Sequence, residues 1–119
     1  ASELEKAIEI TEQIFGKYAF RKWNGTQFEK VFNRAIFDIM VYYFVQPDIG
    51  QKALEKKDEI IQVFKSVCQE NQSFYQSIGS TTKSITAVHT RLSVWGEILR
   101  DNLNIEIRIP TLDNGRIKV

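Results

Sequence analysis

Apolar residues recur every three or four positions through most of the chain, which is the period of an amphipathic α-helix. Capping and turn residues divide this pattern into five predicted helical stretches: 2–17, 26–46, 48–70, 71–79 and 83–101. The second stretch is apolar on most of its sides, and such a helix belongs in the middle of a domain. We therefore expect Phe32 and Ile36 to lie in the core.

The apolar period changes in the tail of the chain. Residues 104–109 alternate strictly between apolar and polar, which is typical of a half-buried strand. Residues 113–116 spell Asp-Asn-Gly-Arg, which favours a tight type I′ turn and a returning strand. The prediction is a mainly α fold: a bundle of four or five helices over residues 1–103, with a β-hairpin tail over 104–119 that is not an independent domain.

Composition limits the classes of protein that this chain can represent. Its 119 residues suit one domain with one core. The formal net charge is only +1, so any basic binding site has to be local. No apolar run approaches the ~20 residues of a membrane span. One cysteine and one histidine suit a reducing compartment, so we expect a cytoplasmic protein that does not enter membranes. The chain opens inside a helical pattern without methionine, which suggests a piece of a longer protein.

Enzymatic motifs are nearly absent from the sequence. It contains no glycine-rich phosphate loop, no His-Glu-x-x-His and no Gly-x-Ser-x-Gly. His89 is the only imidazole, and we predict a structural or solvent-facing side chain. Cys68 has core spacing and is predicted to be a small buried hydrophobe. We therefore expect no catalytic residue, no metal site, no cofactor and no enzymatic activity of this chain alone.

The first candidate binding segment is Ile-Phe-Gly-Lys-Tyr-Ala-Phe-Arg-Lys at residues 14–22. Aromatic and basic residues alternate there and just beyond: Lys17, Tyr18, Phe20, Arg21, Lys22 and Trp23. Such a mixture can stack nucleic-acid bases and neutralise phosphates. Alternatively, the aromatic side chains anchor the segment on the neighbouring helices while the charges remain in water. We expect the aromatic residues to face inward and the basic pair Arg21–Lys22 to face outward.

The second candidate segment lies at the start of the last long helix. Gly79 is followed by three hydroxyl residues and a lysine: Ser80, Thr81, Thr82 and Lys83. Backbone donors at a helix start, hydroxyls and a cation can together bind an anion. Alternatively, this segment only caps the helix. The residues predicted to contact phosphate or nucleic acid are thus Arg21, Lys22, Ser80, Thr81, Thr82, Lys83 and Arg91.

Three phrases, in this order, resemble a known family. They are IFGKYAFRK (14–22), FNRAIFDIM (32–40) and FYQSIGSTTKSITAVHTRLSVW (74–95). They look like the C-terminal helical region of the bacterial domain-of-unknown-function family related to the GmrS half of GmrSD modification-dependent restriction proteins. The resemblance covers roughly residues 10–95.

The resemblance implies a role in restriction and phage defence. Members of that family carry an N-terminal ParB/sulfiredoxin-like domain with an Asp-Gly-Gln-Gln-Arg motif implicated in nucleotide hydrolysis, and some add an HNH nuclease. This sequence contains neither motif, so the resemblance implies a non-catalytic accessory region. That region would buttress the N-terminal domain and contact DNA or nucleotide phosphate. The alternative is a protein–protein interaction or oligomerisation module, which the near-neutral charge favours; clustering of the basic residues would favour the accessory region.

Overall fold

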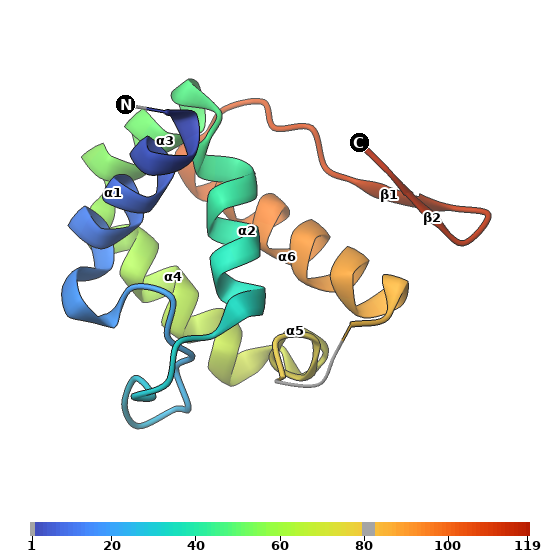
Figure 1. Cartoon of the computed structure of the whole chain (residues 1–119), viewed down its shortest axis with the longest axis horizontal. Helices are drawn as coiled ribbons and strands as arrows, with labels where there is room; N and C mark the ends of the chain where they lie inside the picture. The colour runs from blue at the N-terminus through green and yellow to red at the C-terminus, as the bar shows by residue number, and fades with distance from the viewer. Residues whose placement is uncertain (1, 80–82) are drawn as a thin grey trace.

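The computed structural model describes residues 2–79 and 83–119, and most of these residues are helical (Figure 1). The elements are α1 (Glu3–Phe15), the 3₁₀ helix η1 (Gly16–Tyr18), α2 (Arg34–Phe44), α3 (Pro47–Glu55), α4 (Lys57–Glu70), α5 (Gln72–Ser77), α6 (Ile85–Leu103), β1 (Thr111–Asp113) and β2 (Arg116–Lys118). In Figure 1, α2 stands between α1 and α6 in the helical body. The predicted mainly α fold with a C-terminal hairpin is confirmed.

Three of the largest buried side chains lie where α6 packs against α2 and against α4. Phe64 of α4 and Trp95 of α6 pack edge to face, with ring centroids 5.6 Å apart. Tyr43 of α2 is fully buried and donates a hydrogen bond of 2.6 Å to the Leu92 carbonyl. A Cβ atom at Gly96 would collide with the Tyr43 hydroxyl, so the absence of a side chain there lets α2 approach α6 this closely.

The helix predicted to begin at Thr26 begins eight residues later, at Arg34. Asn24 closes a turn instead, because its side-chain oxygen accepts hydrogen bonds from the backbone N–H groups of Thr26 and Gln27, both at 2.9 Å. The helix start is set by Asn33, whose side-chain oxygen accepts a 2.9 Å hydrogen bond from the Ile36 amide. Residues 19–33 therefore form an irregular connector.

This later start overturns part of the predicted core. Val31 and Phe32 lie in the connector and are 71% and 49% exposed. Phe32 is thus not a core residue, although its ring still packs against Phe20 and Phe37. Ile36 is 1% exposed, so its predicted place in the core is confirmed.

The single helix predicted over 48–70 is two helices, α3 and α4, which meet at Lys56. Residues 55–59 are all charged, so no apolar side chain in that stretch holds a continuous helix against the core. Both helices pack against α1. The break raises the number of α-helices in the described residues to six, one more than the upper bound predicted from the sequence.

The tail contains the predicted turn but not the predicted first strand. Asn114 and Gly115 both have positive φ angles, of 52° and 73°, which match a type I′ turn, and β1 pairs antiparallel with β2 around it. Residues 104–110 form no strand and pair with no other segment in a sheet. Ile107 is nevertheless buried, as the alternation of apolar and polar residues predicts. In Figure 1 the hairpin extends beyond the helical body. Within the described ranges, no helix is long and apolar enough to cross a membrane.

Candidate phosphate-binding cleft

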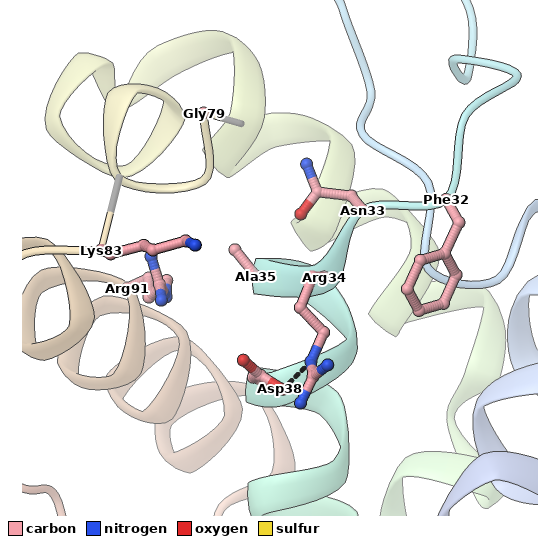
Figure 2. Close-up of a pocket in the computed structure, with 8 residues that line it drawn as sticks. All are labelled: Phe32, Asn33, Arg34, Ala35, Asp38, Gly79, Lys83 and Arg91. Atoms are coloured by element: carbon pink, nitrogen blue, oxygen red, sulfur yellow. Dashed lines mark hydrogen bonds and ion pairs between the residues drawn. The ribbon is translucent and has the colours of Figure 1, made fainter. Parts of the chain in front are cut away.

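A cleft of about 490 Å³ lies between the start of α2 and the start of α6 (Figure 2). Its lining residues are Phe32, Asn33, Arg34, Ala35, Asp38, Gly79, Lys83 and Arg91. Three of these side chains are cationic and one is a carboxylate. Because the whole chain carries a formal net charge of only +1, this cleft concentrates positive charge on one small part of the surface.

Arg91 is the fixed cation of the cleft. Its side chain belongs to α6 and is only 7% exposed, and Nη1 donates a 2.7 Å hydrogen bond to the carbonyl oxygen of Ser77 at the end of α5. Burial lowers the pKa of the guanidinium, and the negative charge of Asp38 opposes that shift. Arginine has so high an ordinary pKa that the side chain stays charged.

Arg34 is held at the cleft by an ion pair within α2. Its Nε lies 2.9 Å from Oδ1 of Asp38, one helical turn further on. Both side chains are exposed, so the pair contributes little to stability in water. It does orient the guanidinium, which also lies over the Phe37 ring with Cζ 5.7 Å from the centroid. The ion pair engages Nε, which leaves the terminal nitrogens of this exposed side chain available to an anion.

Lys83 approaches the cleft from the opposite side. Its side chain precedes α6, and in Figure 2 its ammonium group points across toward the start of α2, with the Arg91 guanidinium close by in the view. Lys83 is exposed, and no ion pair joins it to another residue of the described ranges. The side chain can therefore move toward a ligand without breaking an internal salt bridge.

Two helix starts add a weaker positive field. Asn33 caps α2, and Ser84 caps α6 by accepting a 3.1 Å hydrogen bond from the Ala87 amide. Each cap accepts a hydrogen bond from the third backbone N–H of its helix. The first two N–H groups of each helix are not engaged by the cap, and one of them belongs to Ala35, which lines the cleft. The positive end of a helix dipole attracts anions, so the backbone and the side chains favour the same type of ligand.

The structure brings only some of the predicted contact residues together. Lys83 and Arg91 line the same cleft. Ser80, Thr81 and Thr82 lie outside the described residues. Arg21 and Lys22 do not line the cleft: both are half-buried in the connector, and the Lys22 ammonium lies 4.1 Å from the centroid of the Tyr75 ring.

Arg34 lines the cleft but was not among the residues predicted to contact phosphate. The predicted helix start at Thr26 placed this arginine in the interior of a long helix, where a basic residue suggests only a solvated face. The signal that could have identified it is the neighbouring Asn33, because asparagine is among the best residues for capping a helix start. An arginine directly after that cap lies at the helix end where an anion is favoured.

Cys68, the only cysteine of the chain, does not line this cleft. Burial raises the pKa of the Cys68 thiol to about 12, so it is not an activated nucleophile. In the part of the chain that the structure describes, no cluster of three or more His, Cys, Asp or Glu side chains is placed to hold a metal ion. Searches against models of protein families, curated proteins and solved structures find no match to this chain.

Proposed function

We propose that this chain is a non-catalytic helical accessory domain of a cytoplasmic, GmrSD-related bacterial restriction or phage-defence protein. In this proposal the domain buttresses an N-terminal domain and holds a phosphate of DNA or of a nucleotide in the cleft between α2 and α6. The observation that carries the binding role is the convergence of Arg34, Lys83 and Arg91 in one cleft. The three phrases that resemble that family support its biological setting.

The three cations suit a phosphate in complementary ways. The guanidinium of Arg34 presents a planar fork that matches two phosphate oxygens, whereas the ammonium of Lys83 is a flexible point charge. Arg91 is anchored by Ser77 and supplies a fixed charge at the cleft wall. Because the described lining of the cleft includes no activated nucleophile, we assign it binding and not hydrolysis; hydrolysis would belong to other parts of a longer protein.

A salt titration with two charge-matched double variants tests this function. The probes are a fluorescently labelled 20-base-pair DNA duplex and a labelled adenine nucleotide, each followed by anisotropy. For duplex DNA, Arg34→Ala/Lys83→Ala should reduce the slope of log K against log salt by about two, roughly one for each phosphate that is no longer neutralised. With the nucleotide, the same variant should weaken binding while the control does not.

The control, Lys57→Ala/Arg100→Ala, also removes two charges. Arg100 matches Arg34 because it too pairs with an aspartate on its own helix, at 3.2 Å from Asp101. Equal effects of the two double variants, or no binding of either probe, would contradict the proposal.

A second candidate function is a purely protein-binding module. The exposed Val31 and Phe32 favour it, because adjacent large apolar side chains at the surface are suited to packing against another domain. The partner in this case is the N-terminal domain of the same longer protein. Val31→Ser, a change outside the phosphate cleft, should then weaken binding of that domain, supplied as a separate chain, without changing anisotropy of the DNA or nucleotide probes. Unchanged domain binding would exclude this surface.

A further inference from the structure

A groove of about 370 Å³ lies on a different part of the molecule from the phosphate cleft, between the connector and α4. Its walls include Tyr18, Trp23 and Phe28 of the η1–connector segment and Lys65 of α4. Aromatic residues in this segment were candidates for base stacking in the sequence. The groove depends on none of the residues that line the phosphate cleft.

The connector holds the groove in a defined shape. Trp23 and Phe28 form an antiparallel backbone bridge, and Asn24 closes the turn between them. The Trp23 indole N–H donates a 2.8 Å hydrogen bond to Oε1 of Gln69 on α4. The backbone bridge therefore holds Trp23 beside Phe28, and the indole hydrogen bond holds Trp23 against α4.

Tyr18 is the exposed outer ring of an aromatic stack. Tyr18 stacks on Phe28 with centroids 5.0 Å apart and planes 12° from parallel. Phe28 is supported from behind by Phe64 of the core, whose ring is nearly parallel to it at 6.5 Å. Tyr18 covers only one side of this stack and is 42% exposed. An additional flat ring can extend the stack at Tyr18 when it takes the place of the Lys17 ammonium, which lies 5.2 Å from the Tyr18 centroid.

Two lysines flank the aromatic rings. The Lys65 ammonium lies 4.4 Å from the Trp23 ring centroid, and that of Lys17 lies 5.2 Å from the Tyr18 centroid. Across residues 2–79 and 83–119, neither lysine is paired with a carboxylate. The groove thus combines a partly exposed tyrosine ring with two cations that lie over aromatic rings.

We propose that this groove binds an unpaired nucleobase of single-stranded DNA. The base stacks on Tyr18 in place of the Lys17 ammonium, and the phosphates on either side of it contact Lys17 and Lys65. This occupant matches both features of the groove, because a strand carries a flat π-face and negative charge in each unit. An apolar peptide would use the rings but leave both cations without a partner, and duplex DNA would hide its base faces.

Tryptophan fluorescence tests this proposal directly. The chain has two tryptophans, and Trp95 is fully buried, so a change caused by a surface ligand reports on Trp23. Titration with a 12-nucleotide oligodeoxythymidylate should quench the emission in a saturable manner. Tyr18→Ala should weaken binding roughly tenfold, and Tyr18→Phe should retain it, because stacking requires the ring and not the hydroxyl.

A lysine pair on α4 provides the matched control. Lys65→Ala should weaken binding and reduce the salt slope by about 0.7, as expected for one phosphate of a single strand. Lys57→Ala removes the same charge from the same helix, outside the groove, and should leave binding almost unchanged. Three results would each overturn the proposal: no quenching by the strand, equal quenching by a 12-base-pair duplex, or equal weakening in Lys65→Ala and Lys57→Ala.

Discussion

Arg91 and Lys83 share one cleft but differ in what holds them there. Arg91 is buried and satisfies the carbonyl of Ser77, whereas Lys83 is exposed and has no ion-pair partner in the described ranges. A buried carbonyl that loses its donor costs free energy, and an exposed lysine contributes little. At the scale of single residues, the two cations therefore have different primary effects: Arg91 supports the fold and the cleft wall, and Lys83 is the cation that we propose contacts the ligand.

This difference predicts two stability effects. Arg91→Ala should lower the free energy of unfolding by about 1–3 kcal/mol, because it removes the hydrogen bond that Arg91 donates to the carbonyl of the buried Ser77. Lys83→Ala should change it by less than about 0.5 kcal/mol, as for other surface substitutions. Urea denaturation of the two variants measures both values. Equal destabilisation would show that Lys83 also has a structural role.

Ile36 and Phe32 provide a second comparison. Ile36→Ala should cost about 2–5 kcal/mol, because its side chain is fully buried in the core. Phe32→Ala should cost less than about 1.5 kcal/mol, since the half-exposed ring loses mainly its packing against Phe20 and Phe37. Chemical denaturation measures which of the two substitutions lowers the free energy of unfolding more. A larger effect at Phe32 would place the core at the connector.

Cys68 predicts a pH dependence of stability. Burial raises the pKa of its thiol from 9.0 to about 12. The folded state therefore keeps the proton that the unfolded chain loses, so the stabilisation is complete below pH 9 and is lost as the pH rises toward 12. Over that window this residue should lower the free energy of unfolding by about 1.4 kcal/mol per pH unit. Denaturation between about pH 8 and 11 should show a shallower decline for Cys68→Ala than for the unmodified chain; parallel declines would contradict the assignment.

Helix starts decide the arrangement of the secondary-structure elements around the cleft. The hydrophobic period located each predicted helix because burial is the main source of helix stability. The period alone could not decide whether Thr26 or Asn33 caps the second helix. Thr26 with Glu29 has the local spacing of a cap, but Asn24 engages the Thr26 amide in a turn. Asn33 caps the helix instead, and its hydrogen bond to Ile78 joins residues 45 positions apart, which no local pattern reveals.

Asn33 therefore combines two structural roles that can be separated. Its Oδ1 caps α2, and its Nδ2 donates a 2.9 Å hydrogen bond to the Ile78 carbonyl. Asn33→Asp keeps the cap and loses the second bond, so it should cost about 0.5–1.5 kcal/mol. Asn33→Ala loses both and should cost about 1 kcal/mol more, the usual contribution of a cap. Thermal and urea denaturation test this order, and an equal effect of both substitutions would argue against the cap.

At the scale of the whole molecule, the near-neutral net charge conceals a local concentration of cations. The sequence could predict Lys83 and Arg91 as contact residues because they flank or belong to one helix. It could not predict that Arg34 joins them, because Arg34 is distant from Lys83 in the sequence and its place depends on how α2 packs beside α6. The same packing separates Arg21 and Lys22 from the cleft, although they are closer to Arg34 in sequence.

The most direct test of the central claim is an NMR titration of the chain with inorganic phosphate at constant ionic strength. The predicted result is a saturable shift of the Ala35 amide and of the Nε–H signals of Arg34 and Arg91. These shifts should disappear in Lys83→Ala and remain in Lys57→Ala. Shifts that do not saturate, that spread over surface lysines, or that persist unchanged in Lys83→Ala would contradict a phosphate-binding cleft between α2 and α6.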